Sequence, residues 1–277
     1  MSKIEVDQID PQSGTTLTLG TSGDTVVVPS GVQLAPGGGL TLTGNFVVDG
    51  GTIKLDGNYP TGTDNVALGD TALDTVEAGG TNNTAIGNHA GTAITTGDYN
   101  TALGSLSLES NTTAGNNTAI GGAALRCNTI GCQNTSVGSG SMSANTEGDN
   151  NVAVGRYALN ANTTADNNTA VGFESLKANT TGSHNTAVGL CSLYSNTIGC
   201  KNAAVGSLSM CLNTEGCQNT AFGFQSLLSN TTGDNNTGLG QNALYTNSTA
   251  NNNTAVGRSA YFLILQLLIV QLWVFVL

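Results

Sequence analysis

The stretch Asn185-Thr186-Ala187-Val188-Gly189-Leu190-Cys191-Ser192-Leu193-Tyr194-Ser195-Asn196-Thr197-Ile198-Gly199-Cys200-Lys201 is one period of a repeat that covers most of the chain. Its motif is Asn-Thr-Ala-(Val/Ile/Leu)-Gly, and the glycine of the motif recurs with a first step of 18 residues and then with 17 residues at every step. Twelve such copies predict one structural unit repeated coil on coil. The motif glycines are Gly69, Gly87, Gly104, Gly121, Gly138, Gly155, Gly172, Gly189, Gly206, Gly223, Gly240 and Gly257.

Each period contains two bulky apolar residues. One directly precedes the motif glycine, as Val188 does, and the other is a Leu or Met four residues after it, as Leu193 is; Gly91 takes the second place in one copy. Gly and Asn, which tolerate turn conformations, lie between them. The apolar stretches are too short for helices of ordinary length. The pattern therefore predicts two short strands per period, with a turn after each.

A single period cannot bury its two apolar residues, whereas stacked coils align identical residues into ladders about 4.8 Å apart. We expect Val to stack on Val, Leu on Leu, and Asn on Asn as an amide ladder. The predicted fold is all-β, a parallel β-solenoid or β-roll of 17-residue coils on the order of 50 Å long, and the thin core favours a trimer. The residues expected to form the ladders are Val137, Val154, Val171, Val188, Val205, Leu159, Leu176, Leu193, Leu227, Gly138, Gly155, Gly172 and Gly189.

The composition of the 277 residues argues against an ordinary globular domain. Charged residues make up 9% of the chain, against about 25% in a typical soluble domain. The net charge is −11 without any basic run, so the chain has no electrostatic footprint for nucleic acid. The two histidines and the acidic side chains form no arrangement typical of catalysis or metal binding; they include His89, His184, Glu109, Glu147, Glu174 and Glu215. We therefore expect no enzymatic activity, no cofactor, no catalytic residue and no metal.

Two features of the repeat leave an alternative open. Cys132, Cys200 and Cys217 all lie eleven residues after a motif glycine, so Cys200 and Cys217 would stack as neighbours. A disulfide or a metal site is one interpretation, and small residues in turn positions is the one that we favour. The Thr pairs, such as Thr163-Thr164, could form a flat face like that of ice-binding solenoids, but we favour ladder packing and turn hydrogen bonds as their explanation. The six cysteines are Cys127, Cys132, Cys191, Cys200, Cys211 and Cys217.

Residues 1–62 have a different pattern. Short β-prone runs such as Thr25-Val26-Val27-Val28 and Thr52-Ile53-Lys54-Leu55 alternate with Gly, Pro and Ser, which predicts a β-rich attachment or trimerisation segment. The start of the chain has no apolar stretch typical of a secretory signal. We therefore expect synthesis in a cytoplasm, with residues 63–260 forming the repeat shaft.

The last residues, 261–277, are apolar and uncharged. Seventeen residues are at about the lower limit for a membrane-spanning helix, so a C-terminal membrane anchor is one interpretation. The other is a thirteenth copy of the repeat read out of frame. Displacing plausible codons by one nucleotide places an Asn codon at position 264 and a Gly codon at position 274, and both are in phase with the repeat. We favour the out-of-frame copy, which the nucleotide sequence of the gene would test.

Units such as Asn185-Thr186-Ala187-Val188-Gly189 resemble the head repeats of trimeric autotransporter adhesins, although this period is longer. The resemblance implies a left-handed parallel β-roll in a homotrimer. The recurring pattern NTAVG, SL, NTTG is similar to arrays in tail-fibre and structural proteins of marine tailed bacteriophages. The opening Met1-Ser2-Lys3-Ile4-Glu5-Val6-Asp7-Gln8-Ile9 and the stretch Gly14-Thr15-Thr16-Leu17-Thr18-Leu19-Gly20 also resemble the start of phage tail fibres.

The resemblance implies a homotrimeric virion fibre that contributes to host-surface attachment. Its partners would be copies of itself, phage tail or baseplate proteins, and a host-surface glycan or protein, without nucleic acid or membrane. The fibre would be made in the host cytoplasm and located in the virion tail. The alternative is a bacterial surface adhesin-like solenoid, anchored in a membrane by the C-terminal apolar tail.

Overall fold

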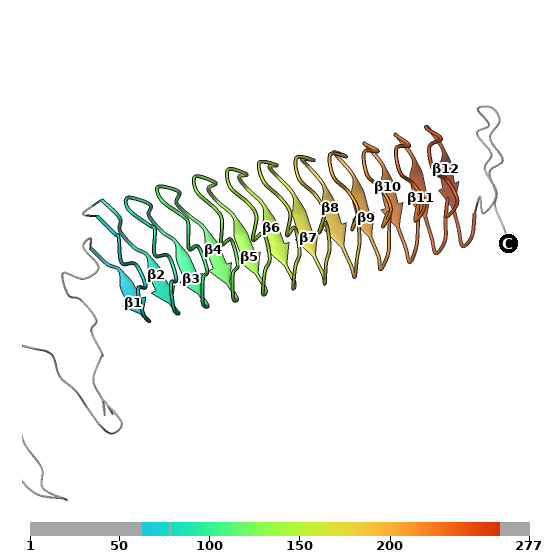
Figure 1. Ribbon diagram of the computed structural model, residues 1–277. Helices are drawn as coiled ribbons and strands as arrows, with labels where there is room; N and C mark the ends of the chain where they lie inside the picture. The colour runs from blue at the N-terminus through green and yellow to red at the C-terminus, as the bar shows by residue number, and fades with distance from the viewer. Residues whose placement is uncertain (1–62, 78, 261–277) are drawn as a thin grey trace, which may run out of the picture. The chain divides into compact units, whose positions relative to one another are not determined.

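The computed structural model describes residues 63–77 and 79–260. The predictions for the N-terminal segment 1–62 and for the apolar tail 261–277 lie outside the described residues. Within them the chain is all-β and forms a parallel β-solenoid of about 11 turns, as the sequence predicted. Figure 1 shows the coils stacked in chain order, with the strands side by side in one sheet.

In the described residues, twelve parallel strands, one in each copy of the repeat, form a sheet in the order β1 to β12. Each strand is three residues long and ends at the residue before the motif glycine. The strands are β1 (Val66–Leu68), β2 (Thr84–Ile86), β3 (Thr101–Leu103), β4 (Thr118–Ile120), β5 (Thr135–Val137), β6 (Val152–Val154), β7 (Thr169–Val171), β8 (Thr186–Val188), β9 (Ala203–Val205), β10 (Thr220–Phe222), β11 (Thr237–Leu239) and β12 (Thr254–Val256).

The register of the sheet places identical positions of the repeat beside one another. Val171 in β7 pairs with Val188 in β8, a step of one period. Hydrogen bonds link each coil to both neighbours: the Thr169 amide donates to the Asn185 carbonyl at 2.8 Å, and the Gly172 amide donates to the Val154 carbonyl at 2.8 Å. The predicted in-register stacking of coils is therefore confirmed.

The prediction of two strands per period was wrong, because the described coils each contain one strand. The Leu or Met four residues after the glycine lies in a turn, and its φ is positive: Leu176 has φ 50°. Glu174 two residues earlier has φ 54°, and Asn167 before the strand has φ 59°. Left-handed residues cost roughly 1–2 kcal/mol each for side chains with a Cβ, and they bend the backbone too sharply for a second strand. Burial of the Leu offsets this strain.

The core contains the Leu row and the Ala row, not the Val row. Leu159, Leu176, Leu193 and Leu227 are completely buried, as predicted. The central residue of each strand is also buried, for example Ala170. Successive residues of a strand point to opposite faces, so an inward Ala places the next Val on the outside.

The prediction that Val stacks on Val in successive coils is therefore confirmed, whereas the prediction that this row forms part of the core was wrong. Its members Val137, Val171, Val188 and Val205 are partly exposed, and Val154 is exposed. The space that remains opposite the large Leu side chain in each thin coil is occupied by a methyl group or a Ser hydroxyl, as at Ala170 and Ser136.

Two buried rows of Asn side chains confirm the predicted amide ladder. In the first row, seven residues after the glycine, the Asn162 amide group donates to Asn145 Oδ1 at 2.7 Å and to the Ala165 carbonyl at 3.0 Å. In the second row, just before each strand, Asn151 Oδ1 accepts from the Asn168 backbone amide at 2.9 Å. The first row thus bonds within its own coil and to a neighbouring coil, and the second row bonds to neighbouring coils, so that most of these buried polar groups are satisfied; the Asn168 side-chain nitrogen is an exception.

The first two coils carry a local exception that the packing explains. Gly91 occupies the place of the core Leu, and a Cβ there would lie 3.0 Å from the Ile94 side chain and 3.1 Å from Leu73. Ile94 occupies the place where later coils have the buried Asn, and it is itself buried. The large side chain has thus moved by three residues along the coil, so that the interior stays filled.

The motif glycines form a row in which neighbouring backbones approach closely. Gly138 has φ +133°, and a Cβ there would lie 2.6 Å from the carbonyl carbon of Gly155. The same geometry holds at Gly155, Gly172 and Gly189, all with φ near +135°. The predicted glycine ladder therefore has a steric cause, since a side chain at this position would hold adjacent coils apart.

Candidate functional surfaces

The outer face of the sheet is an uncharged surface made of two rows. One row contains the first residue of each strand, mostly Thr, and the other contains the last residue, which is always apolar. The apolar side chains remain open to solvent: Leu103 is 44% exposed and Phe222 is 59% exposed. Large exposed apolar patches often mark interaction sites, so this face is a candidate contact surface.

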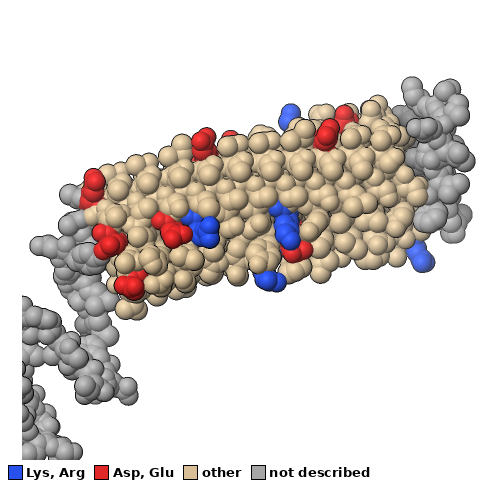
Figure 2. Space-filling model, viewed as in Figure 1, with Lys and Arg blue, Asp and Glu red and all other residues tan. Residues whose placement is uncertain are grey.

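Some residues directly after the motif glycine extend this apolar face. Phe173, Leu190 and Phe224 are exposed. In the sequence, each follows the last residue of a strand by two positions. Charged side chains are sparse on the face seen in Figure 2. The sheet face can therefore bury apolar area against a flat partner without removing a charge from water.

A second surface carries a cluster of basic and aromatic side chains. Lys177 Nζ lies 2.8 Å from Glu174 Oε1, 5.5 Å from the Tyr157 ring centroid and 5.4 Å from that of Tyr194. Arg156 lies over the Tyr157 ring at 4.5 Å. These distances fit cation–π contacts. The hydrogen bond with Glu174 raises the pKa of Lys177 above its usual value, although burial opposes that shift.

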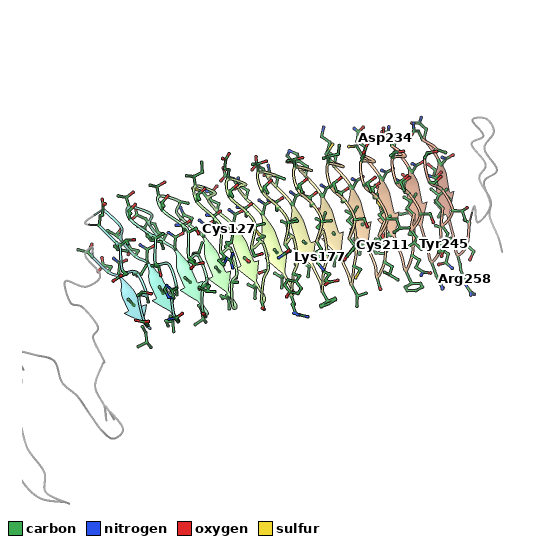
Figure 3. All side chains as sticks on the ribbon, in the orientation of Figure 1. Cys127, Lys177, Cys211, Asp234, Tyr245 and Arg258 are labelled. Carbon is green, nitrogen blue, oxygen red and sulfur yellow. The ribbon has the colours of Figure 1, made fainter. Side chains whose placement is uncertain are left out.

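This basic and aromatic surface follows one edge of the solenoid. Figure 3 shows Lys177, Cys211 and Tyr245 in one row along it, whereas Asp234 lies at the opposite edge of its coil. The three residues in the row all lie five positions after a motif glycine. Their types differ from coil to coil, so this row varies where the core rows do not.

A shallow depression of about 340 Å³ lies on the same surface, between Arg126 and Tyr157. Gly122, Ala123 and Gly140 line its floor. Arg126 Nε lies 3.7 Å from Glu109 Oε2, with both side chains substantially exposed. Beside the Arg126 guanidinium and the Tyr157 ring, the lining contains the Cys127 thiol and the hydroxyls of Ser139 and Ser143, but neither a histidine nor a carboxylate.

The cysteines do not assemble a metal site in the described part of the chain, where no group of three His, Cys, Asp or Glu side chains has suitable geometry. All six are free and partly buried. Cys200 Sγ and Cys217 Sγ lie 2.9 Å apart, as expected for stacked neighbours. Burial, followed by the hydrogen bond with Cys200, raises the pKa of the Cys217 thiol to about 11.

The histidines and the Thr rows have structural environments. His89 Nδ1 lies 3.0 Å from Thr71 Oγ1 of the neighbouring coil, and His184 is exposed. Thr163 Oγ1 donates to the Thr180 carbonyl at 3.2 Å, and Thr180 repeats the bond to Thr197 at 3.1 Å. These hydroxyls hydrogen-bond along the ladder, as the favoured interpretation of the Thr row predicts.

Sequence reasoning missed the cluster around Lys177. The core rows repeat one residue type every 17 positions, so they are visible as a motif. Lys177, Tyr157 and Tyr194 instead meet across coils at separations of 20 and 17 residues, and no motif marks them. Comparing residues two and five positions after successive glycines would have found the cluster.

Together, the stacked coils define a parallel β-solenoid with two distinct exposed surfaces. The chain matches no protein-family model, no curated protein sequence and no solved structure. In the described ranges, none of the secondary structure is a helix of the length and apolar character needed to cross a bilayer.

Proposed function

We propose that this chain is a subunit of a phage virion tail fibre and contributes to attachment to the host surface. The observation that carries the proposal is the stack of near-identical coils with one uncharged, apolar sheet face along its whole length. Such a stack extends by nearest-neighbour contacts alone, as a shaft requires. The assignment to a phage tail rests on the resemblance of the repeat and of the first residues to tail-fibre proteins.

The shaft would act mechanically and not as a catalyst. It would connect tail or baseplate proteins at one end to a host-surface glycan or protein, and it would need neither cofactor nor nucleic acid. Several fibres on one particle would bind many weak sites at once, so that the particle is held by avidity. The varied edge around Lys177 is the part of the described shaft best suited to specific contact, because it combines charge with aromatic rings.

The outer sheet face supports a homotrimer as the working form. Three copies that turn this face inward would bury the apolar row, including Val171, Val188 and Phe222, and would leave the Lys177 edge in contact with solvent. Most side chains of the face are Thr or Val, and Phe222 is the largest in the apolar row. Burial yields roughly 25 cal/mol per Å² of apolar surface, summed over twelve strands.

A charge placed on the sheet face should separate the trimer. We expect the double variant Val171→Lys, Val188→Lys to run as a monomer in light scattering, whereas the unchanged chain runs as a trimer. Both side chains point outward, so the monomer should keep its β circular dichroism. Ile198→Lys is the matched control, because Ile198 is an exposed apolar residue outside the sheet face. A monomeric unchanged chain, or a double variant that stays trimeric, would contradict the homotrimer.

The location of the protein distinguishes the phage fibre from its alternative. We expect antibodies against residues 63–260, detected with gold particles by electron microscopy, to label tail appendages of virions in cultures that express the gene. Labelling of bacterial envelopes would instead favour the adhesin-like solenoid. Labelling of neither structure would refute both functions.

A further inference from the structure

In several coils the side chain eleven residues after the motif glycine caps the backbone of the preceding coil. The Cys132 amide donates to Asp149 Oδ1 at 2.6 Å, and the Asp149 amide donates to Asp166 Oδ1 at 2.7 Å. The Cys217 amide likewise donates to Asp234 Oδ1 at 2.7 Å. An oxygen acceptor is thus a recurring solution at this position.

Two successive coils depart from this pattern by placing sulfur on sulfur. The Cys200 amide donates to Cys217 Sγ at 3.0 Å, in place of the usual oxygen. The two sulfur atoms are 2.9 Å apart, and both side chains are partly buried. Sulfur is a weak acceptor compared with a carboxylate oxygen, so capping alone does not explain a cysteine in both places.

The stacking geometry suits a covalent bond between these two sulfur atoms. Parallel strands lie about 4.8 Å apart, and disulfides join residues whose Cα atoms are about 4.4–6.8 Å apart. The fold therefore holds Cys200 and Cys217 at a suitable backbone separation. Closing the bond requires a sulfur movement of roughly 1 Å, to about 2.05 Å, without separating the coils.

We propose that Cys200 and Cys217 are an oxidation site, at which a low-molecular-weight disulfide such as oxidised glutathione converts the two thiols into a disulfide between adjacent coils. One protein thiolate attacks the glutathione disulfide, forms a mixed disulfide and releases one glutathione thiolate. The second protein thiolate attacks the protein sulfur of the mixed disulfide and releases the other glutathione thiolate. The two protons pass to the released thiolates, so that two reduced glutathione molecules leave.

The reaction requires the Cys217 thiolate whichever cysteine attacks first, because Cys217 is either the attacking or the resolving thiol. With a pKa of about 11 for Cys217, about one molecule in a thousand carries that thiolate at pH 8. Cys200 on one side and Asp234 on the other are the titratable groups that face it. We therefore expect exchange to be slow at neutral pH. Its rate should rise about tenfold for each unit by which the pH is increased, until the pH reaches that pKa.

A second pair of cysteines provides an internal competitor. Burial raises the pKa of Cys211 first, and its neighbour Cys191 raises it further. Burial is also the main cause of the raised pKa of Cys191. These two thiols lie on the edge that carries Lys177, away from the capping row, so peptide mapping separates the two possible linkages.

The test uses the full chain, incubated with oxidised glutathione at pH 7.5 and pH 9 and then digested without reductant. We expect the protein mass to fall by two hydrogen atoms, the titratable thiols to fall from six to four, and one linked peptide pair to contain Cys200 and Cys217. Cys217→Ser should abolish that pair, whereas Cys132→Ser, at the same position of another coil, should preserve it. Circular dichroism of both variants checks that the solenoid remains folded.

Three outcomes would overturn the oxidation site. They are linkage of Cys191 to Cys211 in place of the expected pair, separate glutathione adducts on Cys200 and Cys217 without a link between them, and unchanged thiols at pH 9. Covalent dimers through either cysteine, seen on a non-reducing gel, would also count against a bond within one chain. The inference concerns adjacent coils of one chain, so it stands or falls independently of the fibre function.

Discussion

Gly121→Ala should split the solenoid into two separately melting blocks. Gly121 has φ +130°, and a Cβ there would lie 2.7 Å from both the carbonyl carbon and the carbonyl oxygen of Gly138. A methyl group cannot be accommodated against a neighbouring backbone, and the left-handed region adds its own strain. We expect a loss of about 4 kcal/mol or more in the free energy of unfolding.

The neighbouring residue supplies the control. Gly122 has an open environment, because a Cβ there would meet only the Ser105 carbonyl oxygen, at 3.9 Å. Gly122→Ala should change the stability by about 0.5 kcal/mol or less. Thermal unfolding followed by circular dichroism should show two transitions for Gly121→Ala and one for Gly122→Ala. Similar melting curves for both variants would mean that close contact between coils at the motif glycine does not limit the stacking.

Asn162→Ile should destabilise the middle of the buried amide ladder by about 3 kcal/mol, because it leaves buried polar groups without partners. Asn162 donates to Asn145 Oδ1 and to the Ala165 carbonyl, and it accepts from the Asn179 amide group at 3.1 Å. The Ala165 carbonyl keeps a second donor, Asn151. The Asn145 oxygen loses the bond from Asn162, which is the main cost.

Asn111→Ile is the matched variant at the start of the same row. The coil before it has Ile94 at this position. Because Ile94 has no side-chain oxygen, Asn111→Ile leaves no acceptor in that coil without its hydrogen-bond donor. Asn128 keeps its bond to the Gly131 carbonyl at 2.8 Å, and the Ala114 carbonyl keeps its bond from Asn100. We expect Asn162→Ile to cost about 1–3 kcal/mol more than Asn111→Ile, measured by chemical denaturation. Equal costs would mean that the ladder bonds contribute little beyond filling space.

The period, the parallel stacking and the Asn ladder were predictable because each depends on residues at fixed spacing. Identical residues one period apart must meet once the coils stack, whatever the shape of the coil. The burial of Leu176 followed from the same reasoning, since a large apolar side chain in every coil needs a common interior.

The direction of the Val row was not predictable from hydrophobicity alone. Ala170 and Val171 are neighbours in one strand, so only one of them can point inward, and apolarity favoured the larger Val. The limited width of the coil favours Ala instead, because Leu176 already fills the interior. The missing strand has a related cause: propensity disfavours a positive φ at Leu176, whereas burial of that residue stabilises it.

The candidate surfaces also divide into features that the period of the sequence predicts and features that it does not. The stacked pair of Cys200 and Cys217 was visible from the sequence because it obeys the period. The contacts of Lys177 with two Tyr rings depend on how side chains lean across neighbouring coils, which the period does not encode. The apolar sheet face was missed because it was assigned to the core.

The nearest-neighbour bonding of the coils has a consequence for how such a gene can change. Removing residues 156–172, one whole coil, would bring Gly155 directly before Phe173, and every remaining row would keep its register. Recombination between two copies of the repeat does this in a single event, without altering the reading frame. Related genes can therefore encode shafts that are longer or shorter by whole coils, while the contacts between neighbouring coils stay the same. The length of the shaft can then vary more readily than the shape of its coils.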